Sequence, residues 1–205
     1  MNGAARNWLA CCGLVLLASG WTGAAGGQTQ TEAVQETGPH GKQARFREFL
    51  DKVKQYDQLR NSLRGGIPAA GKKASAEEIK KHQETLAGKI QEARKDAKPG
   101  DLFTANSQMA FRRSIDRAHS GTRAKKIDRT IVQGEPVKID LYVNKAYPEK
   151  MPTTTVPPTL LQHFPKLPKK IEYRIVGDDL VLYDTESNLV IDIFSGAFPN
   201  APPHT

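Results

Sequence analysis

The stretch IEYRIVGDDLVLYDTESNLVIDIF, residues 171–194, decides the fold of this chain. It holds three short runs rich in apolar and β-branched residues, a composition typical of β-strands: Ile171–Val176, Asp179–Asp184 and Leu189–Phe194. Gly177-Asp178 separates the first two runs, and two such residues are typical of a tight hairpin turn. A longer polar turn over 184–188 separates the last two. The stretch therefore predicts an antiparallel meander.

A fourth strand is predicted upstream of this meander. Over 137–143 apolar residues alternate with more polar ones, which is the period of a strand with one buried face. The proline-rich segment 148–169 connects this strand to the meander, with a short helical turn predicted at Thr159–His163. No internal repeat is visible.

Before residue 137 the apolar residues recur every three or four positions, which is the period of a helix. The predicted helices span about 43–63, 75–97, 105–119 and, more briefly, 122–132. Gly65, Gly66 and Pro68 end the first, and Ser75 begins the second with Glu78 at the spacing of a capping box. Helices precede strands along the chain, so the fold class is predicted to be α+β, with amphipathic helices followed by a roughly four-stranded antiparallel meander.

The N-terminus has the three parts of a secretory signal peptide. Arg6 supplies the positive charge, Trp8–Ala18 (WLACCGLVLLA) is the apolar core, and small residues at Gly23 and Ala25 suit cleavage after Ala25. A second cleavage site is available at 18–20. The apolar run is shorter than the roughly 20 residues of a membrane-spanning helix, so an uncleaved anchor is the weaker interpretation.

The boundaries that follow from these segments divide the chain into five parts. They are a signal peptide at 1–25, a disordered leader at 26–41, a helical hairpin at 42–99, an α+β domain at 100–200 and a flexible tail at 201–205. The only cysteines, Cys11 and Cys12, fall at the start of the apolar core, too early for a lipidated cysteine. The mature chain would therefore have neither a disulfide nor a cysteine metal site.

The charge is positive overall and unevenly spread. Thirty Lys and Arg stand against 22 Asp and Glu. Residues 41–74 hold nine basic and three acidic side chains, whereas 171–205 hold one basic and six acidic ones. No basic stretch is interleaved with stacking aromatics, so nucleic acid is not expected as a partner. The mature chain has no second apolar run long enough to span a bilayer, and we expect it to be soluble.

Several ordered motifs resemble a group of uncharacterised exported bacterial proteins over about 46–200. They are ARKDAKPGDLFT at 93–104, FRR at 111–113, YP at 147–148, PPTLL at 157–161, LP at 167–168, EYRIVGDDL at 172–180, D184 with NLVID at 188–192, and AFP at 197–199. The resemblance implies a small exported protein. It implies no reaction, ligand or partner.

Motifs that could carry chemistry are incomplete. Gly66–Lys73 fits the spacing of a phosphate-binding loop but lacks the Ser or Thr after the lysine, and a helix precedes it instead of a strand. The turn at 184–188 begins like a calcium loop but has Leu189 where glycine is required. The five histidines have no metal-binding spacing: His40, His82, His119, His163 and His204. We expect no catalytic set, no metal and no cofactor.

The strongest charge cluster begins in the third predicted helix and continues beyond it, and Asp116 and Asp128 are its only acidic members. Its basic residues are Arg112, Arg113, Arg117, Arg123, Lys125, Lys126 and Arg129. A solvated helix face is the simpler interpretation. The alternative is a binding patch for an anionic ligand, because clustered arginines favour phosphate and carboxylate. Such a patch could also dock on the acidic 178–192 end of a neighbouring molecule.

The sequence alone thus favours an exported, non-catalytic binding or structural protein of the cell envelope. Its expected partner is an envelope protein or an anionic ligand. The alternative is a periplasmic hydrolase with a site in the 145–192 region, which would require a pocket where His163 meets Asp184 or Asp192. An open apolar or basic groove would favour binding.

Overall fold

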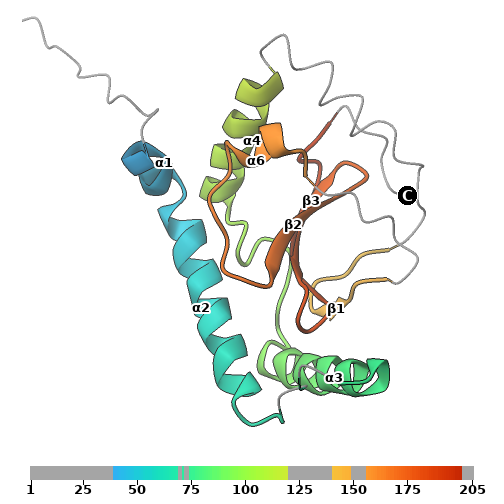
Figure 1. Ribbon diagram of the computed structural model, residues 1–205. Helices are drawn as coiled ribbons and strands as arrows, with labels where there is room; N and C mark the ends of the chain where they lie inside the picture. Colours follow the sequence, from blue (N-terminus) through green and yellow to red (C-terminus); the bar gives the residue numbers. More distant parts are fainter. Residues whose placement is uncertain (1–38, 69–70, 72–73, 120–139, 149–155, 200–205) are drawn as a thin grey trace, which may run out of the picture. The chain divides into compact units, whose positions relative to one another are not determined.

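The sheet forms where the decisive stretch places it. In the computed structural model, β2 (Ile171–Val176), β3 (Asp179–Asp184) and β4 (Leu189–Phe194) are consecutive antiparallel strands. The order across the sheet is β1-β4-β3-β2, so β2 forms one edge (Figure 1). Gly177 and Asn188 adopt positive φ angles of 56° and 54° in the two connecting turns. The predicted meander is confirmed.

The fourth strand differs from the prediction. It is β1, Lys145–Ala146, which pairs with Val190 and Leu189 of β4, whereas 140–144 is not strand and 137–139 lie outside the described residues. Asn144 explains the shift, because its φ of 64° turns the backbone just before the strand. Its side-chain amide also donates to the carbonyl oxygens of Gln91 and Arg94. The spacing of apolar residues along the sequence does not predict this contact of Asn144 with the end of the helix near Gln91 and Arg94.

The structure describes residues 39–68, 71, 74–119, 140–148 and 156–199, and they belong to one compact unit. Its helices are α1 (Pro39–Arg45), α2 (Arg47–Arg64), α3 (Ala76–Ala93), α4 (Ala105–His119) and α6 (Pro158–Leu161). No described helix has the length and apolar character needed to cross a membrane.

Most helix boundaries follow the predicted signals. The capping box at Ser75 and Glu78 is present in both directions, and α2 ends at Arg64 before the two glycines. Two boundaries differ. Helix begins at Pro39, inside the segment predicted as leader, and α3 ends at Ala93, before the predicted end near Ala97.

The helices and one face of the sheet share a single core. Seven aromatic rings lie at its centre in mutual contact: Phe46, Phe49, Phe103, Phe111, Phe164, Tyr173 and Phe194. We predicted that α2 and α3 would pair with each other as a hairpin. The two helices are in contact. In Figure 1 α3 runs across the end of α2, and both helices bury apolar side chains in the core that they share with the sheet.

Candidate functional site

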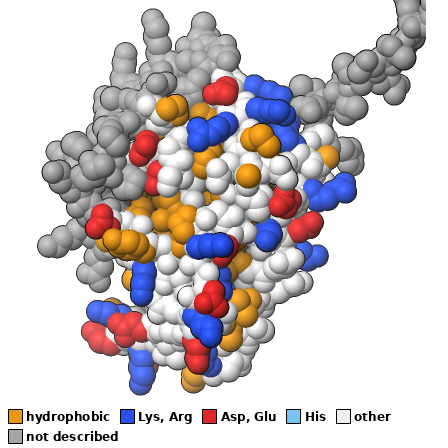
Figure 2. All heavy atoms as spheres, turned by 180° about the vertical axis from the view of Figure 1, so that it is seen from behind, with side chains coloured by type: hydrophobic (Ala, Val, Ile, Leu, Met, Phe, Trp, Pro, Cys, Tyr) orange, Lys and Arg blue, Asp and Glu red, His pale blue; other side chains and the backbone are white. Residues whose placement is uncertain are grey.

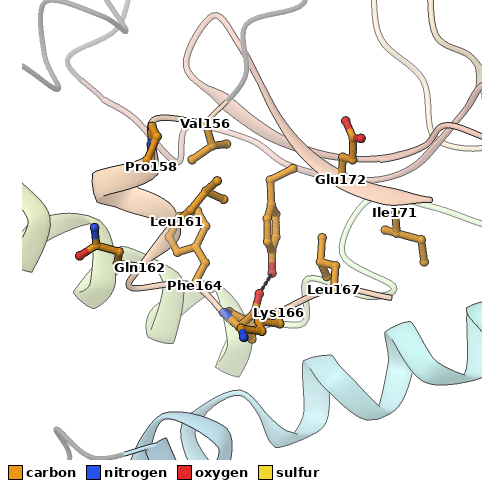
Figure 3. Close-up of a pocket in the computed structure, with 11 residues that line it drawn as sticks. Val156, Pro158, Leu161, Gln162, Phe164, Lys166, Leu167, Ile171 and Glu172 are labelled. Atoms are coloured by element: carbon orange, nitrogen blue, oxygen red, sulfur yellow. Dashed lines mark hydrogen bonds between the residues drawn. The ribbon is translucent and has the colours of Figure 1, made fainter. Parts of the chain in front are cut away.

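An open groove of about 730 Å³ lies beside the edge strand β2 (Figure 3). One wall consists of α6 and the segment that follows it, and the other wall is the start of β2. Apolar side chains line most of it, with Gln162, Lys166 and Glu172 among them. The lining residues are Val156, Pro158, Leu161, Gln162, Phe164, Pro165, Lys166, Leu167, Ile171, Glu172 and Tyr173.

Prolines and a hydrogen bond shape this groove. Pro158 starts α6, where its fixed φ suits the first helical turn. The helix ends within one turn, and Phe164 then enters the core. Tyr173 holds the returning segment, because its buried hydroxyl donates to the Pro165 carbonyl oxygen at 3.1 Å, the dashed line in Figure 3. The wall formed by α6 and the segment after it is therefore held at its start by Pro158 and at its end by the bond from Tyr173 to Pro165.

Leu161 is the most conspicuous side chain of the groove. It is 43% exposed although it belongs to the apolar wall. Lys166 and Glu172 are also exposed, so one positive and one negative side chain flank the apolar surface. An apolar hollow with a few polar groups at its margin is the usual form of a ligand site, and its volume falls in the common range.

The first acidic residue of the hydrolase hypothesis, Asp184, belongs to a buried polar cluster. Tyr56 donates its hydroxyl to Asp184 Oδ2 at 2.7 Å, and Arg60 Nη1 lies 3.4 Å from Oδ1. The backbone amide of Glu186 donates to the same Oδ1. Arg60 also contacts Asp57 and donates to the Lys169 carbonyl oxygen. We call Tyr56, Arg60 and Asp184 the buried cluster; it joins α2 to the end of β3.

The second acidic residue, Asp192, fastens the loop before α4 to the sheet. Its carboxylate accepts hydrogen bonds from the backbone amides of Gly100, Leu102 and Phe103 at 2.6–2.8 Å, and from the amide of Ile193. Burial raises the pKa of Asp192, while these amide donors act in the opposite direction. Three of the donors belong to the GDLF motif at 100–103, so these motif residues serve the scaffold.

His163 does not join either carboxylate. Within the described residues, the hydrogen bonds of Asp184 and Asp192 go to residues other than His163. His82, on α3, lies 3.0 Å from the Pro68 carbonyl oxygen through Nδ1. Within the described ranges no three His, Cys, Asp or Glu side chains are grouped so as to hold a metal ion. The arrangement that the hydrolase hypothesis requires is not assembled.

The predicted basic patch is described in part. Arg112, Arg113 and Arg117 are exposed on α4, whereas Arg123, Lys125, Lys126 and Arg129 lie outside the described residues. Arg112 donates to the Gly196 carbonyl oxygen at 3.1 Å, and its guanidinium lies 4.9 Å from the centre of the Phe194 ring. Figure 2 shows basic and acidic side chains interspersed over one face. Arg112 therefore binds α4 to the end of the sheet.

The uneven charge distribution also has an internal explanation. Basic side chains from the helical part meet acidic ones from the sheet within one molecule: Arg60 with Asp184, and Arg64 with Glu186 at 3.3 Å. Asp179 accepts a hydrogen bond from the Gly196 amide at 2.8 Å. Much of the acidic end is thus engaged by its own chain, which leaves less of it for a neighbouring molecule.

Local patterns did not reveal the groove. The apolar residues of 156–167 have neither the period of a long helix nor that of a strand, and prolines interrupt them. The available signal was an apolar residue, Leu161, in a short helical turn next to a proline-rich loop. Comparison with protein-family models, with curated proteins and with solved structures finds no match to the chain. The interpretation of the site therefore rests on its own geometry.

Proposed function

We propose that the protein is an exported, non-catalytic binding protein of the cell envelope and that the groove beside β2 is its ligand site. The observation that carries the proposal is the open apolar groove, in which Leu161 remains 43% exposed. Export rests on the N-terminal segment, whose charge, apolar core and small residues fit a cleaved signal peptide.

Binding is favoured over hydrolysis because the acidic candidates are buried in the scaffold, whereas Leu161 of the groove wall faces solvent. Asp184 and Asp192 are buried and engaged by donors of the scaffold. A general acid or base needs access to its substrate. The described residues that line the groove, in contrast, offer apolar surface and include no nucleophile held beside a base. Burying apolar ligand surface there is favourable by about 25 cal/mol per Å².

The groove can be tested with the dye 8-anilino-1-naphthalenesulfonate, whose fluorescence rises in apolar sites. The chain beyond residue 25 contains no tryptophan, since Trp8 and Trp21 are the only ones, so protein fluorescence does not interfere. We expect saturable binding that Leu161→Asp weakens about tenfold or more, because a carboxylate would enter the apolar wall.

Met109→Asp is the matched control. Met109 is 53% exposed on α4 and does not line the groove, so the same apolar-to-acidic change should leave dye binding unaltered. Equal affinity of the two variants would show that the dye binds elsewhere and would remove the support for this site.

Export has its own test. Mass spectrometry of the protein recovered from the cell envelope should find an N-terminus at Gly26, the first residue after the preferred cleavage point. Recovery from the cytoplasm with residues 1–25 intact would contradict export. It would not affect the proposal that the groove is a ligand site.

A further inference from the structure

We propose that the groove beside β2 binds a single-chain anionic amphiphile, a long-chain fatty acid, with its acyl chain against the apolar wall and its carboxylate beside Lys166. The inference rests on the proposed function and specifies the class of ligand. The lining of the groove combines an accessible apolar surface with one accessible positive charge. A fatty acid has the two complementary parts, an apolar chain and one negative charge.

The accessible apolar surface of the groove is aliphatic. Pro158 and Leu161 are exposed and lie three positions apart on α6, which places them on the same side of this helical turn. Leu167, in the segment after α6, is half-buried and extends this surface. The two aromatic lining residues, Phe164 and Tyr173, are buried in the core. A ligand therefore meets aliphatic side chains, and a flexible acyl chain suits them because it gains from burial and dispersion contact without ring stacking.

Lys166 supplies the accessible positive charge. The lining holds two charged residues, Lys166 and Glu172. Glu172 bonds to Arg174 at 2.6 Å and lies apart from Lys166 in Figure 3. Within the described residues, the Lys166 side chain is exposed and takes part in no ion pair or hydrogen bond. An anion in the groove would thus gain a counter-charge without displacing an internal partner.

The segment after this lysine adds to the positive potential. Lys169 and Lys170 are exposed. Arg60, which donates to the Lys169 carbonyl oxygen, also pairs with Asp57 and Glu186, so these two carboxylates already have a positive partner. Exposed charges act on one another over a Debye length, about 8 Å at physiological ionic strength. The neighbouring lysines therefore reinforce the attraction of an anion to this end of the groove.

The dimensions of the site favour one amphiphile molecule over a lipid bilayer. A hollow of about 730 Å³ has the size of a site for a single small ligand. Recognition of an anionic bilayer uses clusters of about 4–8 Lys or Arg beside the membrane, whereas the segment 166–170 holds three lysines. Docking on a bilayer is an outcome of the test below.

The test measures binding of dodecanoate to the protein in its exported form by isothermal titration calorimetry, below the concentration at which the amphiphile forms micelles. Dodecyltrimethylammonium has the same chain with a positive head group and is the matched ligand. We expect saturable binding of dodecanoate that is about tenfold tighter than binding of the cation. Decanoate and octanoate should bind progressively more weakly, by up to about fourfold for each methylene removed from the groove.

Substitution of the lysine tests the counter-charge directly. Lys166→Gln should weaken dodecanoate binding about fivefold and should not weaken binding of the cation, because it removes one positive charge and leaves the apolar wall intact. Lys95→Gln is the matched control and should leave both affinities unchanged. Lys95 is exposed next to Arg94, which contacts Asn144 beside β1, at the opposite edge of the sheet from β2.

The contrary results are separable. Dye binding without dodecanoate binding, equal affinities for the two dodecyl amphiphiles, or equal affinities of Lys166→Gln and Lys95→Gln for dodecanoate would overturn the anionic ligand, while the groove stays a ligand site. Sedimentation with phosphatidylglycerol vesicles in place of binding to monomeric dodecanoate would assign the lysines to a membrane surface and overturn the inference. Failure of both the dye and dodecanoate to bind would overturn the proposed function as well.

Discussion

The buried cluster and the groove beside β2 lie on the same sheet and are built from different residue types. Asp184 and Arg60 are 0% and 3% exposed and are held by several partners. The groove is walled by apolar side chains, and Leu161 stays in solvent. Among the described residues, Arg60, Asp184 and Asp192 are engaged by other groups of their own chain, whereas the groove presents apolar side chains to a ligand.

Among the substitutions that test this difference between the buried cluster and the groove, Asp184→Ala should have the largest effect on the free energy of unfolding. The change leaves the Arg60 guanidinium buried with its remaining partners and removes the acceptor of the Tyr56 hydroxyl. Breaking a buried ion pair by removing one member costs about 3–5 kcal/mol. We expect a loss of that order in the free energy of unfolding, measured in urea by circular dichroism.

Asp51→Ala is the matched control for this loss. Asp51 is exposed on α2, so the same substitution should change the free energy of unfolding by less than about 0.5 kcal/mol. If Asp184→Ala were as harmless as Asp51→Ala, the buried cluster would be dispensable for stability, and Asp184 would again be a candidate for function.

A second, smaller loss is expected for Asp192→Asn. The amide side chain keeps one acceptor oxygen, but its NH₂ group would face backbone N–H groups that Asp192 now satisfies. Leaving a buried donor unpaired costs about 1–3 kcal/mol. The urea midpoint should fall accordingly, and dye binding in the groove should persist below the transition. Loss of dye binding by the folded variant would mean that Asp192 serves the groove.

Much of the fold could be predicted because local rules determine it. The turn at Gly177-Asp178 and the capping box at Ser75 and Glu78 depend on neighbouring residues, and the structure confirms both. The fourth strand was misplaced because Asn144 bonds to Gln91 and Arg94, which are distant in sequence. Long-range hydrogen bonds of this kind leave no periodic signal.

The candidate site was much less predictable than the fold. A groove arises from how a short irregular segment returns to a sheet edge, here through the bond from Tyr173 to Pro165. The sequence pointed instead to charge. Arg112, one of the seven basic residues of the predicted patch, donates to the Gly196 carbonyl oxygen and lies over the Phe194 ring of its own chain. Clustered charges cannot be assigned to a partner before internal partners are known.

Alkaline pH tests both regions at once, because each contains a buried tyrosine. Burial, followed by the negative charge of Asp184, raises the pKa of Tyr56, and burial raises the pKa of Tyr173 well above its ordinary value. Above about pH 10 these hydroxyls ionise in the unfolded chain while they stay protonated in the folded one. The folded state then binds more protons, so stability falls as pH rises, by about 1.4 kcal/mol per pH unit for each tyrosine.

Urea unfolding at pH 9, 10 and 11 measures this slope. Tyr173→Phe should reduce it by the contribution of one tyrosine. Tyr142→Phe, at a position 61% exposed, should leave it unchanged. A slope that Tyr173→Phe does not alter would indicate that water reaches the Tyr173 hydroxyl from the groove. The inner end of the groove would then be hydrated, unlike the buried cluster.

The smallest effect on stability is expected for Leu161→Asp. Leu161 is 43% exposed at the end of α6, so the substitution removes little buried surface, and the free energy of unfolding should change by about 0.5 kcal/mol or less. The same variant should lose dye binding. Leu161 would then contribute little to the free energy of unfolding but much to binding, whereas Asp184 would contribute to stability and not to binding. If Leu161→Asp instead destabilised the fold by about 2 kcal/mol or more, the wall would be part of the core, and its exposure would need no ligand to explain it.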